Sequence, residues 1–261
     1  EPPPLLMTTT KSAEIIKHAS NAFLALKISF INAVSNLCEA TNANVEQVAR
    51  GMGLDTRIGP KFLRPGIGYG GSCFPKDVAA FRSVAEQLGI DFSLLTEVEK
   101  INVQQKKRFV SKVRSALWNL RGKKLAVLGL AFKGDTDDIR ESPAIEIVRM
   151  LINEGCSITA FDPAAIERTQ QVLPAGKNVR YAADAYEAAD EADALLILTD
   201  WQEFAELDLR RINQSLRYPI IIDGRNLYDP AVMNDHGFTY LSIGRPAVHP
   251  VRDMASASSK A

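Results

Sequence analysis

The sequence predicts an α/β protein with an all-helical region over residues 12–120, followed by a doubly wound parallel sheet over residues 121–244. Two observations lead to this prediction. Apolar residues recur with helical spacing through most of the first 120 residues, whereas the chain after Arg121 alternates short apolar runs with helical segments. Continuous apolar strands separated by helices are typical of a parallel sheet that is covered on both faces.

The predicted helical region opens with a long apolar segment over residues 12–43. Apolar residues lie on nearly all its sides, so we expect a buried helix. A shorter helix over 45–52 ends near Gly51 and Gly53, and helices over 78–88 and 93–117 follow a glycine-rich loop. Residues 1–11 begin with a run of prolines, and we expect a linker that follows an upstream portion of the chain.

The second region has the pattern of a Rossmann-like domain. Its predicted strands cover residues 125–130, 157–162, 194–198 and 220–223, and a helix is expected over 142–154. Residues 245–261 are poor in large apolar side chains and end in small polar ones, which predicts a flexible tail.

The composition limits the class of function. Lys plus Arg and Asp plus Glu each number 31, so a net charge of zero gives no general attraction to nucleic acid or to a membrane surface. No apolar run approaches the roughly 20 residues of a membrane span. Three scattered cysteines are too few for a disulfide framework, which favours a reducing, cytoplasmic location. The three histidines show no metal-ligand spacing, so we predict no metal site.

The loop over residues 62–77 combines glycines with a cysteine. Gly66, Gly68, Gly70 and Gly71 would let successive backbone N–H groups turn toward a phosphate, although a tight turn without a ligand has the same signature. This loop is the first candidate for a binding site.

The residues after these glycines predict a nucleophile. Pro75 suits the first turn of a helix, so Cys73 is expected just before a helix N-terminus, where partial positive charge favours a thiolate. Lys76 adds a cation, and Asp77 could orient or deprotonate a water. The alternative for a cysteine is a small buried hydrophobe, which we favour for Cys38 and Cys156.

Four further charged or polar residues are of interest, and the three charged ones each have two possible interpretations. Lys17 and Asn21 are four apart, share a face of the first helix and are both expected to be buried. Such a lysine could serve as a base or oxyanion partner, or only pack its stem and keep its ammonium in water. Arg57 and Arg64 could meet phosphate, or be solvated surface charges.

The turn over residues 128–134 superficially imitates a dinucleotide-binding unit. Gly129 and Gly134 do not complete the glycine fingerprint, and Lys133 occupies the turn, so a basic contact to one nucleotide fits better. We interpret Asp162 as the cap of a strand end.

Five motifs then point to one known family. They are Ile16-Lys17-His18-Ala19-Ser20-Asn21-Ala22-Phe23-Leu24-Ala25, Arg57-Ile58-Gly59, Gly70-Gly71-Ser72-Cys73-Phe74-Pro75-Lys76-Asp77, Ala131-Phe132-Lys133-Gly134-Asp135-Thr136 and Asp138-Ile139-Arg140-Glu141-Ser142. In order and spacing the set resembles the UDP-glucose dehydrogenase family over residues 12–228, and the cysteine motif is highly specific.

This resemblance implies a protein with an N-terminal NAD-binding domain, a central helical dimerisation region and a C-terminal UDP-sugar-binding domain, of which this chain has the last two. It implies NAD-dependent oxidation of UDP-glucose to UDP-glucuronate in two hydride steps, with a thiohemiacetal and then a thioester on Cys73. Without the first domain, we expect this chain to be inactive alone.

The resemblance also implies residue roles and a homodimer through the central helices. The catalytic residues would be Cys73, Lys17, Asn21 and Asp77. Substrate contacts would come from Lys17, Asn21, Arg57 in the neighbouring subunit's site, Arg64, Pro65, Gly66, Ile67, Gly68, Tyr69, Gly70, Phe132, Lys133 and Arg225. NAD contacts would come from Cys73, Lys76 and Arg140.

Three alternatives remain open at this point. The first is a dehydrogenase for another nucleotide sugar, especially GDP-mannose. The second is a non-catalytic module that dimerises and holds a nucleotide sugar. The third is a thiol hydrolase or acyl transferase that uses Cys73 with Lys17 and Asp77, although it would lack a histidine partner for the cysteine.

Overall fold

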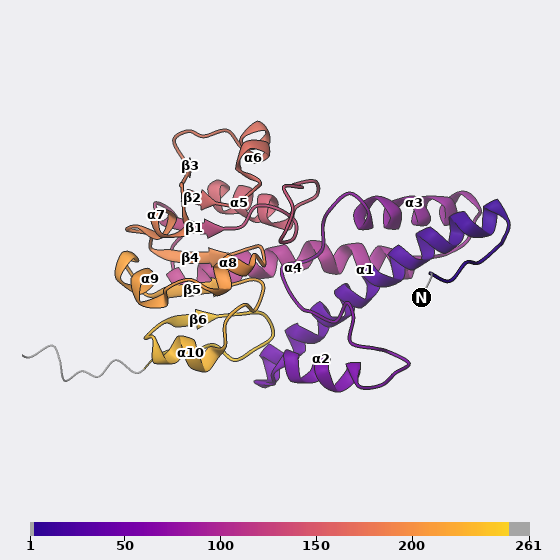
Figure 1. Cartoon of the computed structure of the whole chain (residues 1–261), viewed down its shortest axis with the longest axis horizontal. Helices are drawn as coiled ribbons and strands as arrows, with labels where there is room; N and C mark the ends of the chain where they lie inside the picture. Colours follow the sequence, from indigo (N-terminus) through magenta and orange to yellow (C-terminus); the bar gives the residue numbers. More distant parts are fainter. Residues whose placement is uncertain (1–2, 251–261) are drawn as a thin grey trace, which may run out of the picture.

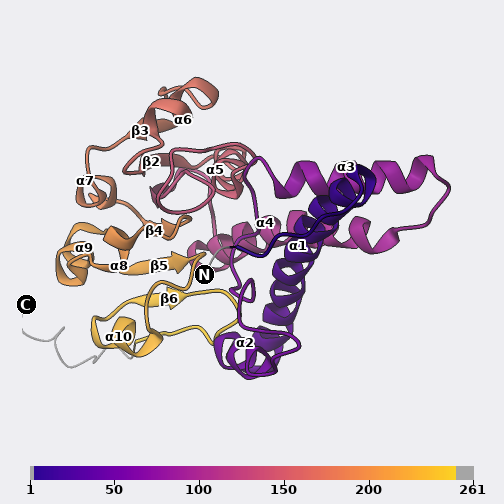
Figure 2. The same cartoon turned by 45° about the vertical axis from the view of Figure 1, so that its right-hand side comes forward.

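The computed structural model describes residues 3–250 and has a helical part beside an α/β part (Figure 1). The helical part contains α1 (Thr10–Thr41), α2 (Val45–Gly53), α3 (Phe74–Gln87) and α4 (Ser93–Leu117). The rotated view shows α3 and α4 running alongside each other, with α1 crossing them and α2 at the far end of α1 (Figure 2). This order confirms the predicted fold class.

Helix α1 is longer than the other helices and begins and ends with defined caps. The Thr9 hydroxyl accepts the Ser12 N–H, and at the other end Asn42 takes a left-handed conformation and donates its N–H to the Cys38 carbonyl. By length and composition alone α1 could cross a membrane, since an 18-residue window has a mean hydropathy of 1.2 and is 39% buried. A core helix of a soluble protein has the same properties, so this indication is weak.

One side of α1 is not covered, which corrects the expectation of a helix buried all round. Ile16, Phe23, Phe30 and Leu37, which recur every seven residues, are 46%, 61%, 49% and 65% exposed. Seven residues are close to two helical turns, so these side chains form one stripe. The opposite side carries Ala22 and other residues that pack against α3 and α4. We call the four exposed residues the α1 stripe.

The α/β part contains a sheet of six parallel strands in the order β3-β2-β1-β4-β5-β6. The strands are β1 (Lys124–Leu128), β2 (Ser157–Phe161), β3 (Val179–Tyr181), β4 (Ala194–Ile197), β5 (Ile220–Asp223) and β6 (Thr239–Leu241). The chain starts in the middle of the sheet and winds outward in both directions, which is the doubly wound order. The short strands β3 and β6 were not predicted, because three residues give no clear apolar pattern.

Helices cover both faces of this sheet. They are α5 (Pro143–Asn153), α6 (Ile166–Val172), α7 (Ala185–Ala189), α8 (Gln202–Ala205), α9 (Leu209–Ser215) and α10 (Pro230–Asp235). On one face Val127 packs with residues of α4 and α5, and on the other Leu128 packs with residues of α7 and α9. The C-terminal half of α4, including Phe109 and Val113, therefore belongs to the core of the sheet and connects the two parts.

Packing continues beyond residue 244, which corrects the predicted start of the flexible tail. Arg245 is 4% exposed and donates to the Tyr240 hydroxyl at 2.7 Å, while its other nitrogen lies 3.3 Å from Glu46 of α2. Val248 pairs with Tyr240 in an antiparallel bridge. The predicted tail over 251–261 and the first two residues of the predicted linker lie outside the described residues.

Candidate active site

The glycine-rich loop runs between the two parts and is held by side-chain amides of α1 and α4. Asn32 accepts the Gly66 N–H at 2.9 Å, and Gln105 donates to the Gly66 carbonyl at 3.0 Å. Asn102 accepts the Tyr69 N–H at 2.8 Å and donates to the Tyr69 carbonyl at 3.0 Å. All three amides are buried. These polar residues lie in otherwise apolar helices because they form hydrogen bonds with backbone groups of a buried loop.

Two glycines of the loop lie directly against the segment between β1 and α5. A Cβ atom at Gly70 would overlap the Glu141 carbonyl and lie 2.8 Å from Pro143 Cδ. Gly71 has φ +83° and donates its N–H to the Arg140 carbonyl at 2.9 Å. Close backbone approach and positive φ both require glycine here, so this contact fixes the loop relative to the α/β part.

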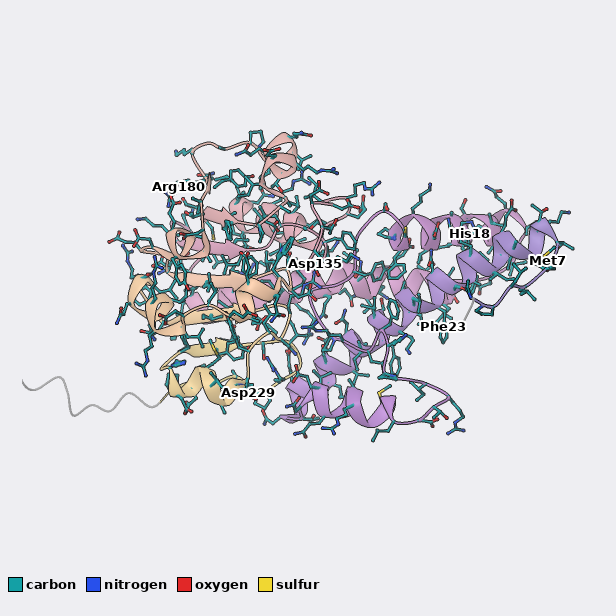
Figure 3. All side chains as sticks on the ribbon, viewed as in Figure 1. Met7, His18, Phe23, Asp135, Arg180 and Asp229 are labelled. Carbon is teal, nitrogen blue, oxygen red and sulfur yellow. The ribbon has the colours of Figure 1, made fainter. Side chains whose placement is uncertain are left out.

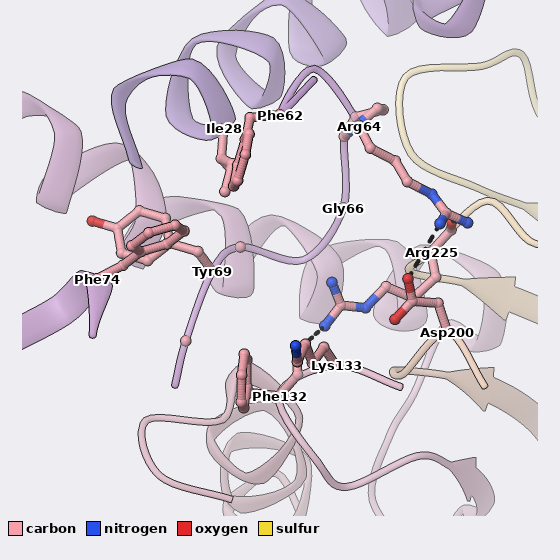
Figure 4. Close-up of a pocket in the computed structure, with 13 residues that line it drawn as sticks. Ile28, Phe62, Arg64, Gly66, Tyr69, Phe74, Phe132, Lys133, Asp200 and Arg225 are labelled. Carbon is pink, nitrogen blue, oxygen red and sulfur yellow. Dashed lines mark hydrogen bonds and ion pairs between the residues drawn. The ribbon is translucent and has the colours of Figure 1, made fainter. Parts of the chain in front are cut away.

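A first cavity of about 300 Å³ opens on one side of this loop (Figure 4). The residues that line it are Ile28, Phe62, Arg64, Pro65, Gly66, Gly68, Tyr69, Gly70, Phe74, Phe132, Lys133, Asp200 and Arg225. Nine of these thirteen are among the substrate contacts that the resemblance to a family implies. The cavity has an aromatic end, where Phe74 lies 6.1 Å from Phe62 and 6.0 Å from Tyr69 between ring centroids, and a charged end.

The charged end is built from loops that follow strands. Arg225, after β5, donates to the carbonyls of Leu198 at 2.8 Å and Phe132 at 3.0 Å. Asp200, after β4, accepts from Arg64 at 3.2 Å across the boundary between the two parts. Burial lowers the pKa of Arg225 from its usual value, yet an arginine remains charged at neutral pH.

Asp200 is ionised in this setting. Burial alone would raise its pKa, but the charges of Arg225 and Arg64 and the N–H of Gly134 outweigh that effect, so the pKa lies below its ordinary value. The charged end therefore presents more positive than negative groups, because Lys133 also lines it. Such a set suits a ligand with more than one negative charge.

A second cavity of about 770 Å³ lies beyond the same loop. Its lining residues are Lys17, Gly71, Ser72, Cys73, Pro75, Lys76, Asp77, Arg140 and Glu141. Gly70 lines the first cavity and Gly71 the second, so the two cavities are separated by one peptide unit of the loop.

Cys73 stands at the start of α3, as predicted. It occupies the N-cap position, with Pro75 in the first turn of the helix, and it is exposed. Cys38 and Cys156 are buried, and burial raises the pKa of Cys156 to about 11. The geometry thus separates one accessible thiol from two inaccessible ones.

Asp77 lies one turn after Cys73 and is 3% exposed. Asn21 donates to its Oδ2 at 2.5 Å, and Lys17 Nζ lies 3.6 Å from the same oxygen. His18 Nδ1 lies 3.4 Å from Oδ1. These three groups of α1 and the carboxylate of α3 form one cluster.

The burial predicted for Lys17 is wrong. Its side chain is 66% exposed, whereas Asn21 is only partly exposed. Helical spacing placed both residues on one face, but Lys17 lies where that face meets the open second cavity, so its ammonium reaches Asp77 without being desolvated.

Arg57 and the side chain of Ile67 lie away from both cavities. Arg57 is 87% exposed and forms a two-pronged pair with Asp55, whose pKa this hydrogen bonding lowers. Lys27 donates to the Ile58 carbonyl at 2.9 Å and so ties this turn to α1. Ile67 is fully buried and packs in the core beneath the loop, against Gly224.

The turn after β1 has its backbone groups occupied. Asp162 accepts the N–H groups of Leu130 at 2.6 Å, Ala131 at 3.1 Å and Ala165 at 2.8 Å, and the indole N–H of Trp201 at 3.2 Å. This agrees with its interpretation as a strand-end cap. The N–H groups of Leu130 and Ala131 are therefore already occupied, whereas Lys76 and Arg140 on the second cavity could pair with a cofactor phosphate. Within residues 3–250 no group of three His, Cys, Asp or Glu side chains could hold a metal ion.

Four residues of the first cavity were not predicted as substrate contacts. Ile28, Phe62 and Phe74 give the first cavity its apolar side, and nothing in their local pattern distinguishes them from core residues. Asp200 could have been found, because it follows β4 as Lys133 follows β1, and ligands bind at the carboxyl ends of such strands.

Comparisons with known proteins agree with this geometry. The central domain of the UDP-glucose/GDP-mannose dehydrogenase family matches residues 11–104, and the UDP binding domain of that family matches residues 126–230. UDP-glucose 6-dehydrogenase TuaD of Bacillus subtilis (strain 168) is 47% identical over 245 residues, covering 94% of this chain and 53% of the relative. The chain spans about half the length of the curated relatives it matches.

Two solved structures extend the comparison. A UDP-glucose dehydrogenase from the archaeon Pyrobaculum islandicum has a TM-score of 0.84 at 35% identity, covering 93% of this chain and 53% of that one. A GDP-mannose dehydrogenase from Pseudomonas aeruginosa has a TM-score of 0.53 at 26% identity, covering 84% of this chain and 51% of that one. Of these two structures, the UDP-glucose dehydrogenase is the more similar to this chain in both fold and sequence.

Proposed function

The chain belongs to the UDP-glucose/GDP-mannose dehydrogenase family, and from this premise we propose that it supplies the sugar-nucleotide site and the catalytic cysteine of a UDP-glucose 6-dehydrogenase. The proposed reaction is the NAD-dependent, four-electron oxidation of UDP-glucose to UDP-glucuronate. One observation carries the proposal: a cationic cavity and a cavity with an exposed thiol meet at Gly70 and Gly71.

The first cavity would hold the nucleotide. Arg225, Lys133 and Arg64 supply the positive charge that a diphosphate requires, and Asp200 keeps Arg64 in place. The aromatic end gives apolar surface for the flat base or the sugar. The sugar end of the ligand would then point past Gly70 toward Cys73.

The second cavity would carry out the chemistry. Two molecules of NAD, bound one after the other, would each accept one hydride ion. The Cys73 sulfur would add to the carbonyl carbon of the aldehyde, and the Lys17 ammonium would stabilise the oxyanion. After the second oxidation, water adds to the thioester carbonyl, its proton passes to Asp77, and the C–S bond breaks with its electron pair returning to sulfur.

Calorimetry with UDP-glucose and GDP-mannose tests the ligand. We expect heat of binding for UDP-glucose, and Arg225→Leu to weaken binding by about tenfold or more, since it removes a charged hydrogen-bond donor. Arg210→Leu, an exposed arginine on α9, is the matched control. Preference for GDP-mannose would favour the alternative dehydrogenase, and no binding of either would contradict the proposal, provided that circular dichroism shows a folded chain.

The chain by itself is expected to give no NADH absorbance with UDP-glucose and NAD. The reason is that Asp162 already occupies the N–H groups of Leu130 and Ala131 in the turn after β1, which a dinucleotide-binding turn would offer to the cofactor. Turnover would contradict this part of the proposal. Binding of UDP-glucose together with absent iodoacetamide labelling of Cys73 would instead favour a non-catalytic binding module.

We also propose a homodimer through the α1 stripe. An apolar face of this length on a long helix is suited to a second copy of itself. Arg57 supports the same proposal, because its exposed guanidinium is held outward and away from this chain's own cavities. Phe30→Glu is expected to convert the dimer to monomers in sedimentation velocity, whereas Trp118→Glu, at a 92% exposed residue on the end of α4, is not. A monomeric unmodified chain would contradict the proposal.

A further inference from the structure

His18 faces the same carboxylate as Lys17 and Asn21 but has no assigned role. It lies on α1 (Figure 3), and its ring stacks on Phe81 of α3, with centroids 6.4 Å apart and an interplanar angle of 26°. Phe81 and Asp77 are four residues apart, so they occupy one face of α3. The imidazole is therefore held beside Asp77 by its packing.

The contact between His18 and Asp77 determines where the imidazole carries its proton. Nδ1 lies 3.4 Å from Asp77 Oδ1, within ion-pair range, but their present orientation is not that of a hydrogen bond. Nδ1 is buried and has no hydrogen-bond partner among residues 3–250. A bare lone pair would repel the carboxylate, which favours hydrogen on Nδ1, and a small rotation of either group would complete an Nδ1–H to Oδ1 hydrogen bond.

The two oxygens of Asp77 then have separate partners. Oδ2 accepts from Asn21 at 2.5 Å and has Lys17 at 3.6 Å, whereas Oδ1 faces His18. A carboxylate held on one oxygen can still turn about its Cβ–Cγ bond. Contacts on both oxygens remove that freedom.

We propose that His18 is a positioning residue for Asp77, which it orients through Nδ1–H for the attack of water on an acyl group carried by Cys73. This inference rests on the proposed function, in which Asp77 receives the proton of that water. His18 itself exchanges no proton with the substrate. Water adds to the acyl carbon, its proton goes to Asp77, and the C–S bond breaks to release the carboxylic acid and the Cys73 thiolate.

Deacylation of acetylated Cys73 tests the proposal on the chain as it stands. p-Nitrophenyl acetate should acetylate the exposed Cys73, and intact mass spectrometry then follows loss of the acetyl group. We expect His18→Leu to slow this loss by about tenfold to a hundredfold, the effect of losing one hydrogen bond to a charged group. His18→Asn, whose amide nitrogen can replace Nδ1–H, should restore most of the rate. His236→Leu, at a histidine on the C-cap of α10, should leave it unchanged.

The outcomes separate this inference from the proposed function. If Asp77→Asn slows deacylation and His18→Leu does not, Asp77 keeps its role and the inference on His18 is overturned. If Asp77→Asn has no effect either, the proposed water activation fails as well. Equal slowing by His18→Leu and His18→Asn would also overturn the inference, since a general packing defect does not distinguish a donor from its absence.

A spectroscopic measurement gives an answer that does not depend on acylation. In ¹⁵N spectra of the imidazole, recorded where His18 is neutral, the hydrogen should reside on Nδ1 in the unmodified chain. In Asp77→Leu it should move in part to Nε2, because the carboxylate that selects the tautomer is gone. Hydrogen on Nε2 in the unmodified chain would overturn the proposal whatever the kinetics.

Discussion

Two loops of this protein combine glycines with a strand or helix end: the turn after β1 lines one cavity through Phe132 and Lys133, whereas the loop over residues 62–73 borders two. In the turn after β1, Asp162 and Thr199 occupy the groups of Leu130 and Ala131. The loop over residues 62–73 is also anchored, but its anchors hold its buried edge and leave both flanks open to a cavity. A glycine pattern shows that the backbone can lie close to another group. The surrounding side chains decide whether that group belongs to the protein or to a ligand.

The largest loss of stability is expected at Gly129, in the turn after β1. Gly129 has φ +94°, and a Cβ there would lie 2.5 Å from Thr199 Oγ1 and 2.6 Å from its backbone nitrogen. Gly129→Ala should lower the free energy of unfolding by more than about 3 kcal/mol, measured by urea denaturation. Gly176→Ala is the matched control, because among the described residues nothing lies within 4 Å of its Cβ position. A small loss at Gly129 would mean that this turn is adaptable.

A smaller loss is expected from removing the cap that closes the same turn. Asp162→Ala leaves the N–H groups of Leu130 and Ala131 buried without a partner, which should cost about 2–3 kcal/mol of the free energy of unfolding. Asp162→Asn keeps an acceptor oxygen and should cost less. Equal losses for the two variants would show that charge, rather than the acceptor, matters at this position.

The smallest effect on stability is expected at Cys73, in the loop over residues 62–73. Cys73→Ser changes an exposed side chain and should alter the free energy of unfolding by less than about 0.5 kcal/mol. It should nevertheless abolish rapid iodoacetamide labelling, because Cys38 and Cys156 are buried. A stability loss comparable to that of Asp162→Ala would remove the distinction between a structural turn and a functional loop.

The sequence predicted much of the site because several site residues are close together along the chain. Pro75 predicted the helix start at Cys73, and the predicted strand ends placed Lys133 and Asp162 at the carboxyl ends of neighbouring strands. The role of Arg225, and that of Arg57 in a neighbouring subunit's site, came only from the resemblance to a family. Asp200 and His18 went unassigned, since each matters through a partner far away in the sequence: Arg64 for Asp200, and Asp77 for His18.

By itself, the sequence determined the two-part fold, the parallel sheet, the cysteine at a helix start and the family motifs, because periodicity and short-range capping are local properties of the chain. Only the tertiary structure decided which face of α1 stays uncovered, that Lys17 is exposed, that Arg245 packs against the helical part and that two cavities meet at Gly70 and Gly71. Each of these depends on which distant element lies opposite a residue, and that is fixed when the helices and the sheet pack together.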